Sequence, residues 1–302
     1  MNKKNLIFIV LAIMLLIPKF TNALELNSNS LINEQSALKY KKEILNEEDF
    51  YLSNEWFDDN GELLPIIATE TKYVETITKT DKYGNVLSLE NNIISEEEYN
   101  NYTSTISSMK TRGISTDNEI ETNAKKLKVT VMLDDPDDYS VYKVSVVNIW
   151  KTMPKVRSFD TIGLLYNGTG IESLTNAYGY QYFNYEHNTS RQSVNYSWHG
   201  NNMKLEPNGN DRGVSISQNI LDDTYSILQN ELWAYFNITQ GSIRFNASYQ
   251  HAVKSIDLAI SKNFTFDVAG MGGVFNWNTS TSNWDNMDGV CKNITSQYLW
   301  YC

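Results

Sequence analysis

The sequence predicts a mainly β protein whose C-terminal domain is an antiparallel β-sandwich, jelly-roll-like or closed as a barrel. Three observations lead to this fold class. From Leu127 onward, short strand-like segments follow one another and are separated by clusters of Asn, Gly and Ser. No long helical pattern lies between them, which disfavours a parallel α/β sheet. No internal repeat indicates a propeller or a solenoid.

The clearest strand signal runs from Leu228 to His251. Apolar residues occupy every second position in each half of this stretch, with Asn230 as the one exception, and this is the period of a half-buried strand. The polar loop Thr239–Gly241 lies between the halves, and we therefore predict two antiparallel strands joined by a tight turn. Phe245, Tyr249 and His251 are expected to face the core, and Trp233 to face outward.

Other segments of the C-terminal domain also have the composition of strands. They are rich in β-branched and aromatic residues and are bounded by turn-forming residues. The predicted strands are residues 127–133, 141–151, 159–166, 175–185, 193–198, 213–217, 256–260 and 264–268.

Residues 1–23 have the three parts of a secretory signal: two early lysines, an apolar run and small residues spaced for cleavage. We therefore expect a secreted protein. An uncleaved N-terminal anchor is the alternative interpretation. After the signal, no segment approaches the roughly 20 apolar residues of a membrane-spanning helix, so no membrane partner is expected.

The predicted N-terminal region, residues 24–103, is small and mixed α/β. A surface helix is predicted at 33–50, and a hairpin at 72–94 turns around Gly84. Ser95 and Glu98 have the spacing of a capping box. Residues 104–126 are mostly polar and are predicted to be a linker, which leaves 127–302 as the sandwich domain.

The net charge excludes some classes of partner. The whole chain carries −11, and loss of the signal, which has three lysines and no acid, takes the net charge to −14. Such an acidic protein repels nucleic acid and anionic membranes. Neither is expected as a partner.

The two cysteines, Cys291 and Cys302, lie close together near the end of the chain. In a secreted protein such a pair predicts a disulfide. The short loop would contribute roughly 2–3 kcal/mol, enough to fix the tail but not to hold the domain together.

The sequence contains no recognisable catalytic motif, and no catalytic residue is assigned. The histidines His187, His199 and His251 are not spaced as metal ligands, and no GxSxG segment is present. The carboxylate pair of a glycosidase is defined by distance in space. Any two of four glutamates therefore remain candidates for such a pair: Glu172, Glu186, Glu206 and Glu231.

No cofactor is expected, and Ca²⁺ is the one metal that the sequence leaves open. Four acids surround Pro136 and are candidate oxygen ligands: Asp134, Asp135, Asp137 and Asp138. A second acidic loop contains Asp285, Asn286 and Asp288. Neither loop has the EF-hand pattern, and a solvated turn between strands is the alternative.

Aromatic residues give the candidate binding surface. Tyr178, Tyr180 and Tyr182 share one face of a predicted strand, while Trp277 and Trp284 flank a polar loop that leads into Asp285. Together with the outward Trp233, these rings are candidates for stacking on sugars. Packing inside the protein is the alternative for each of them.

Two stretches resemble segments of uncharacterised exported proteins of Gram-positive bacteria. One contains Trp150, Met153, Pro154, Arg157, Ser158, Phe159 and Asp160, and the other contains Tyr249, Gln250 and His251, followed by the turn at 270–273. The resemblance covers about the last half of the chain. It implies a secreted β-rich domain and carries no activity with it.

These observations favour a secreted, non-catalytic protein that binds carbohydrate or another component of the cell envelope. Two alternatives remain open. One is an extracellular glycan hydrolase whose carboxylate pair is not visible in the sequence. The other is a secreted competition or immunity factor with a processed N-terminal region.

Overall fold

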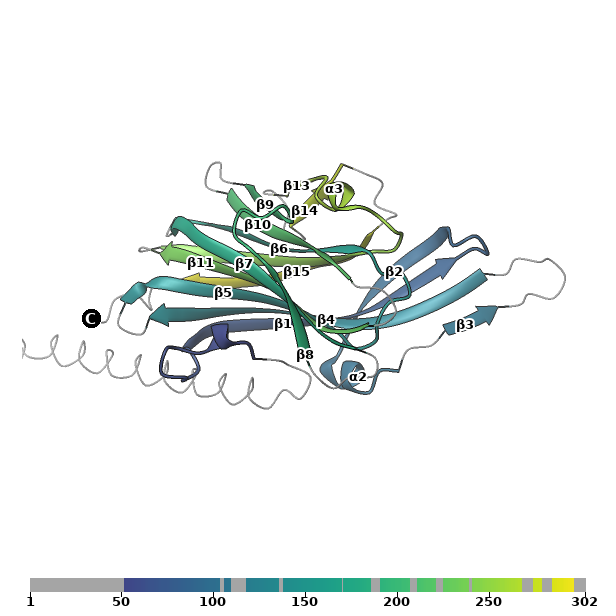
Figure 1. The fold of residues 1–302 in the computed structure, drawn as a ribbon, viewed down its shortest axis with the longest axis horizontal. Coiled ribbons are helices and arrows are strands. Elements are labelled where there is room, and N and C mark those ends of the chain that lie inside the picture. The colour runs from purple at the N-terminus through teal and green to yellow at the C-terminus, as the bar shows by residue number, and fades with distance from the viewer. Residues whose placement is uncertain are drawn as a thin grey trace, which may run out of the picture. The chain divides into compact units, whose positions relative to one another are not determined.

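Two antiparallel β-sheets pack against each other and form the body of the protein (Figure 1). The computed structural model describes residues 52–103, 106–109, 118–135, 138–169, 171–185, 191–206, 211–220, 225–238, 241–267, 274–278 and 284–295. These residues belong to one compact unit, Glu48–Leu299. The predicted antiparallel β-sandwich is confirmed, and the sheets do not close into a barrel.

The larger sheet has eight strands in the order β2-β1-β4-β5-β11-β7-β8, and β3 pairs with β4 beside this path. Its strands are β1 (Ile66–Thr80), β2 (Val86–Ile94), β3 (Ile106–Met109), β4 (Asn118–Asp135), β5 (Asp138–Trp150), β7 (Ile171–Tyr185), β8 (Arg191–Tyr196) and β11 (Tyr225–Ile238). In Figure 1, one end of the β1, β2 and β4 group extends past the smaller sheet.

The smaller sheet has five strands in the order β15-β12-β6-β10-β9. They are β6 (Phe159–Gly168), β9 (Met203–Glu206), β10 (Asp211–Asn219), β12 (Ser242–Ala252) and β15 (Trp284–Thr295). A separate pair consists of β13 (Phe264–Phe266) and β14 (Phe275–Trp277). The helical elements are short: η1 (Asn54–Trp56), α2 (Glu96–Asn100) and α3 (Leu258–Ser261).

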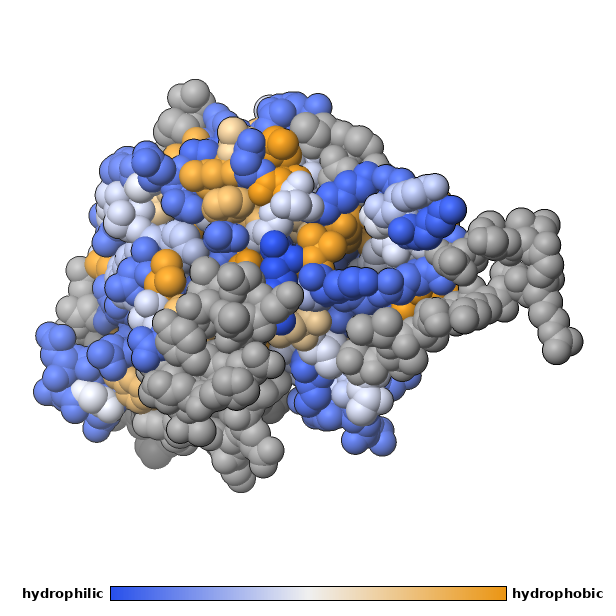
Figure 2. All heavy atoms as spheres, turned by 45° about the vertical axis from the view of Figure 1, so that its right-hand side comes forward, coloured by the Kyte–Doolittle hydropathy of each residue, from blue (hydrophilic) through white to orange (hydrophobic). Residues whose placement is uncertain are grey.

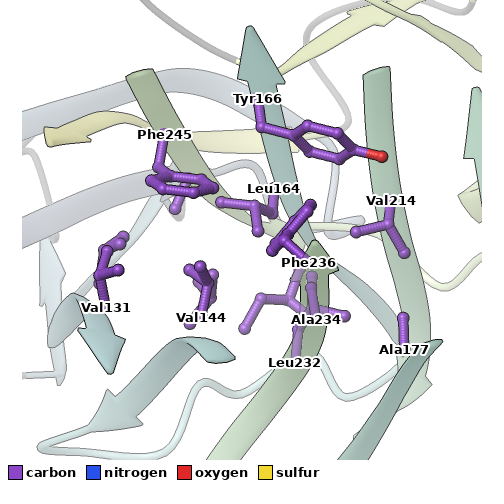
Figure 3. Close-up of a cluster of buried hydrophobic side chains, with 14 of the residues drawn as sticks. Val131, Val144, Leu164, Tyr166, Ala177, Val214, Leu232, Ala234, Phe236 and Phe245 are labelled. Atoms are coloured by element: carbon purple, nitrogen blue, oxygen red, sulfur yellow. The ribbon is translucent and has the colours of Figure 1, made fainter. Parts of the chain in front are cut away.

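The apolar faces of the two sheets meet in one core (Figure 3). Leu232, Ala234 and Phe236 of β11 contribute from the larger sheet, and Tyr166 of β6 and Phe245 of β12 from the smaller one. The Phe236 ring lies edge-on to that of Tyr166, with 4.5 Å between the ring centroids, and 5.4 Å from that of Phe245. Burial of these apolar faces is the main force that holds the sheets together.

The predicted hairpin at 228–251 is wrong in its pairing, although both of its strands are present. β11 pairs with β5 and β7, whereas β12 pairs with β6 and β15 in the other sheet. The chain therefore crosses from one sheet to the other after Ile238. The reason is that both strands are strongly apolar on one face, and crossing lets Phe236 and Phe245 face each other across the core.

Gly179 marks a point where the two sheets approach too closely for a side chain. A Cβ atom there would lie 2.6 Å from Cδ1 of Ile216 on β10 and 2.7 Å from the backbone oxygen of Glu231 on β11. The backbone contact cannot be relieved by a change of rotamer.

We therefore expect Gly179→Ala to lower the free energy of unfolding by about 1–3 kcal/mol. Urea unfolding followed by circular dichroism measures the change. The matched control is Gly84→Ala at the exposed β1–β2 turn, where no atom lies within 4 Å of the added Cβ and only the positive φ of 81° is strained. Equal losses in the two variants would contradict the close approach.

The predicted hairpin at 72–94 is confirmed, but it belongs to the same sheet as the later strands. β1 pairs with β2 on one side and with β4 on the other. Asp81 holds the turn by accepting hydrogen bonds from the backbone amides of Tyr83 and Asn85, each at 2.8 Å. Residues before and after the predicted boundary at 104–126 are thus joined by backbone pairing.

Part of the predicted linker is strand. β4 begins at Asn118, and Ala124, Lys125 and Lys126 within it are buried. Lysines, acids and Asn occupy most of residues 118–126. Because several of these polar side chains are buried, the stretch lacks the apolar alternation by which a strand is recognised in the sequence. Residues 110–117 lie outside the described part of the chain.

The structure confirms the predicted start of one helix and contains a short helix where a strand was predicted. The capping box is confirmed: Ser95 Oγ accepts from the Glu98 amide at 3.2 Å, and the Glu98 carboxylate accepts from the Ser95 amide at 2.7 Å, at the start of α2. The strand predicted at 256–260 is wrong, because Asp257 caps the short helix α3 by accepting from the Ile260 amide at 2.8 Å.

Several predictions concern residues outside the described part of the chain: the signal at 1–23, the helix at 33–50 and Cys302, hence also the disulfide. Among the described helices, none has the length and apolar character needed to cross a membrane.

Candidate functional site

A polar pocket of about 260 Å³ lies where β1 and β4 face the ends of β12 and β15. β1 contributes Thr76, Thr78 and Thr80, and the ends of β12 and β15 contribute His251 and Asp285. The rest of the lining comes mainly from β4 and the segment after β5, with Glu119, Glu121, Asn123, Pro154, Lys155 and Val156. The volume is slightly below the roughly 300–1,000 Å³ of sites for drug-sized ligands, and suits a ligand of about one sugar ring.

The register of β1 and β4 builds one wall of the pocket. Thr76 lies opposite Asn123, Thr78 opposite Glu121, and Thr80 opposite Glu119. Because side chains at every second position share one face of a sheet, these three pairs line up in a row. Successive pairs are separated by about 7 Å along the strands. The wall therefore offers hydroxyl, amide and carboxylate groups in sequence.

His251 lines the inner end of the pocket, and Asp160 holds its ring in place. His251 Nδ1 lies 2.9 Å and 3.2 Å from the two carboxylate oxygens of Asp160 on β6. Asp160 also accepts hydrogen bonds from the Tyr249 hydroxyl and, at 3.2 Å, from the Ala252 amide. The indole of Trp150 donates to the Tyr249 hydroxyl at 3.0 Å. The imidazole ring is therefore fixed by a network that is itself buried.

Lys125 and Asp285 form a second buried pair beside the first. Both side chains are completely buried and are joined by a charge-assisted hydrogen bond. Asp285 also accepts from the Thr76 hydroxyl at 3.3 Å and from the His251 amide at 3.2 Å. The Lys125 ammonium lies 4.8 Å from the centre of the Trp150 ring, which adds a cation–π contact.

The proton of the Asp160–His251 pair belongs on His251. Burial alone would lower the pKa of His251, but the carboxylates of Asp160 and Asp285 raise it above its ordinary value. Burial pushes the pKa of Asp160 upward as well. Three donors point at the Asp160 carboxylate, however, and such bonds favour its ionised form. We therefore assign an imidazolium paired with a carboxylate.

This assignment leaves one polar atom of His251 for the pocket. The side chain is 5% exposed, and its ring lines the pocket. Nδ1 is engaged by Asp160, and Nε2 has no hydrogen-bond partner among the described residues. An imidazolium carries a hydrogen on each ring nitrogen. His251 can therefore donate from Nε2 to an oxygen atom of a bound molecule.

The outer part of the pocket carries two more carboxylates. Glu119 pairs with the Lys155 ammonium at 2.6 Å. Glu121 accepts from the Lys155 backbone amide at 2.6 Å and from the Asn123 side-chain amide at 2.8 Å. Glu119 is thus compensated by a cation, whereas the two hydrogen-bond donors to Glu121 are neutral.

The predicted tyrosine surface is covered by the chain itself. Glu55 of η1 accepts hydrogen bonds from the hydroxyls of Tyr178, Tyr180 and Tyr235. Tyr182 is buried. Burial, strengthened by Tyr235 and Glu55, raises the pKa of Tyr178, and burial with Glu55 raises that of Tyr180 to about 12. These rings serve to hold residues 52–65 against the larger sheet.

Trp233 and Glu231 lie beneath the same segment. Trp233 is completely buried and packs edge-on against Trp56, with 5.3 Å between the ring centroids. The buried Glu231 carboxylate accepts from the Trp233 indole at 2.8 Å and from the Gln229 amide. Burial, partly offset by these bonds, raises its pKa to about 7. The outward face of β11 is thus an internal layer, which periodicity alone did not reveal.

The predicted tryptophan pair is also packed within the protein. Trp277 and Trp284 stack with their ring centroids 3.7 Å apart, and Trp284 is only 1% exposed. The Trp277 indole donates to Gln250. Asp285, next to Trp284, does reach the polar pocket. The structure therefore brings one member of this predicted set to the candidate site.

The predicted calcium ligands are only partly described. Asp134 pairs with Lys143 at 2.8 Å, and Asp137 lies outside the described residues. Within the described ranges, no group of three or more His, Cys, Asp or Glu side chains is placed to hold a metal ion. The described residues therefore give no geometric support to the predicted calcium site.

Several pocket residues were not singled out from the sequence: the threonine row, Glu121 and Lys125. The alternation of Thr76, Thr78 and Thr80 was a usable signal, since it places three hydroxyls on one strand face. Lys125 and Glu121 fell in the stretch predicted as linker. Their role depends on a pairing register that the sequence does not show.

Comparisons with known proteins identify no family for this chain. No family model matches it, and no curated protein matches it. Among solved structures, it is similar to the Clostridium perfringens NetB toxin in its membrane-inserted form, with 10% identity over 63% of this chain and 92% of that one. The TM-score is 0.15, which is too low to support a conclusion about fold or function.

Proposed function

We propose that this protein is a secreted, non-catalytic binding protein whose ligand is a carbohydrate of the cell envelope or its surroundings. The polar pocket is the proposed binding site. The observation that carries the proposal is the combination of a row of hydroxyl, amide and carboxylate groups with a donor at the inner end, His251 Nε2, that has no hydrogen-bond partner among the described residues. A sugar presents both donors and acceptors on one small ring.

The buried network supports a binding role because it fixes the pocket before any ligand arrives. Asp160, Tyr249 and Trp150 hold the His251 ring, and Lys125 holds Asp285. A pre-organised site loses less conformational entropy when it binds. The aromatic residues that first suggested sugar binding are buried or held by contacts within the chain, so the proposal now depends on polar groups.

Titration with soluble monosaccharides and cell-wall fragments should change the tryptophan fluorescence in a saturable way. The reporter is Trp150, whose ring lies edge-on to His251 at 5.1 Å between centroids. In Trp150→Phe this fluorescence change should be lost, and binding measured by calorimetry should weaken, because the indole no longer supports the Tyr249 hydroxyl that helps to hold His251. If none of these glycans binds to the folded protein in calorimetry, the proposal is rejected.

Glycan hydrolysis is the second candidate, and one observation favours it. Glu119, Glu121 and Asp285 line the same pocket, so the fold brings the distant Asp285 to the two glutamates of β4. Glycosidases use two such groups about 5–10 Å apart. Incubation of each bound glycan with the protein, followed by mass spectrometry of the products, separates cleavage from binding alone.

A further inference from the structure

We propose that the polar pocket selects a sugar that bears a free amino group, with its ammonium at Glu121 and a ring oxygen or hydroxyl oxygen at His251 Nε2. This inference rests on the proposed carbohydrate-binding function and narrows the class of sugar. It follows from how the charges of the pocket are paired.

Every other charged group at the pocket has an opposite charge in contact with it. Lys125 is joined to Asp285, His251 to Asp160 at 2.9 Å, and Lys155 to Glu119 at 2.6 Å. Each pair is close to neutral as a unit, so none of these groups provides an uncancelled charge for a ligand.

Glu121 is the exception. Its carboxylate accepts from a backbone amide and from the Asn123 side chain, and no cation lies within 4.0 Å of it among the described residues. Both donors are neutral, so the negative charge at this position is not cancelled. An ammonium group on a ligand would supply the missing countercharge and up to three hydrogen-bond donors.

The position of Glu121 suits a ligand of one ring. Thr78 lies opposite Glu121, and Thr76, which contacts Asp285 at the inner end, is one two-residue step away. That step is about 7 Å along the strand. A single sugar ring is about this size. One edge of the ring can therefore accept a hydrogen bond from His251 Nε2 while a substituent on the opposite edge contacts Glu121.

The net charge of the protein also favours a cationic ligand. The chain carries −11 as a whole. The face shown in Figure 2 is mainly hydrophilic, and its apolar residues lie in separate groups. A negatively charged protein attracts cationic ligands and repels acidic ones. Uronic acids and phosphorylated sugars should therefore bind more weakly than amino sugars.

The test compares matched sugars by calorimetry in mildly acidic buffer, where the amine carries its proton. The set contains glucose, galactose and mannose with their 2-amino, N-acetylated 2-amino and uronic acid counterparts. We expect at least one amino sugar to bind about tenfold more tightly than its neutral and N-acetylated counterparts, as for a hydrogen bond to a charged group. The uronic acids should bind most weakly.

Glu121→Gln should remove this preference, so that the variant binds the amino sugar and its neutral counterpart with equal affinity. Glu90→Gln is the matched control, because Glu90 is exposed on β2 and pairs with Ile77, on the opposite face of the sheet from Thr76 and Thr78. The control should keep the preference.

The experiment distinguishes failure of the amino-sugar preference from failure of the binding function. If neutral or acidic sugars bind as tightly as the amino sugars, or if Glu121→Gln retains the preference, the amino-sugar inference is overturned and the binding function stands. If no sugar of the set and no cell-wall fragment binds, the binding function itself is overturned.

Discussion

Replacing Lys125 by methionine is expected to lower the free energy of unfolding by about 3–5 kcal/mol. Methionine is nearly as long as lysine but carries no charge, so Asp285 remains completely buried without its lysine partner. An unpaired buried carboxylate is among the most destabilising changes known in proteins. Urea unfolding followed by tryptophan fluorescence measures the effect.

The double variant Lys125→Met with Asp285→Asn should recover a large part of this loss, because it removes both charges together. Lys82→Met is the matched control, since Lys82 is exposed at the β1–β2 turn and should change stability by less than about 0.5 kcal/mol. Wild-type stability in the Lys125 variant would show that the pair does not support the pocket.

Replacing Glu231 by glutamine is expected to flatten the dependence of stability on pH. Burial raises the pKa of Glu231 from 4.5 to about 7. Between these values the unfolded chain has released the proton and the folded protein still holds it. Stability therefore falls as the pH rises from about 4.5 to 7 and is constant above that, with a total loss on the order of 3 kcal/mol.

The measurement is the unfolding free energy of wild type and variant at several pH values between 4 and 8. The difference between them should change across this window by roughly the amount given above. The Asp160–His251 pair contributes in the same direction at higher pH, because a raised histidine pKa gives stability that is lost as the pH rises above about 6.5. That contribution is present in both proteins and cancels in the difference.

Two results would contradict the assignment of Glu231. One is a difference that is independent of pH. The other is a wild type that gains stability from pH 4.5 to 7 relative to the variant, which would mean that the carboxylate is ionised when folded. Glu90→Gln serves again as the exposed control and should follow the wild type.

The sequence was sufficient to predict most strands, because their apolar residues alternate regularly. β12 is the best example: Ile243, Phe245, Ala247 and Tyr249 face the core as expected. His251 extends the same alternation and is buried. Local signals of this kind depend only on neighbouring residues, and the capping box of α2 belongs to the same class.

The partners of the strands could not be predicted in the same way. β11 and β12 follow each other in the chain and still lie in different sheets. Alternation shows which face of a strand is apolar but not which other apolar face it meets. The burial of Trp233 has the same cause, since its cover, Trp56, comes from a segment far away in the sequence.

Most residues of the candidate site could not be predicted from the sequence. They come together through the pairing register of the strands and through buried ion pairs, and neither is visible in the sequence. Glu121 and Lys125 looked like the polar residues of a linker, yet β4 places one in the pocket and buries the other. Asp160 and Asp285 are also far apart in the sequence and meet at His251. Conversely, Tyr182, Trp233 and Trp284, which were candidates for an exposed binding surface, are buried, because large rings are also good fillers of the interior.

If a ligand binds in the polar pocket, it contacts the ring of His251. The NMR signals of that ring therefore detect binding at this site directly. The chain has three histidines, so selective ¹⁵N labelling of histidine gives a simple NMR spectrum with His187 and His199 as internal references. During a sugar titration the ring nitrogen signals of His251 should shift, saturate with the affinity measured by calorimetry, and move more than those of the other two histidines. Saturable sugar binding that leaves the His251 signals in place would contradict it.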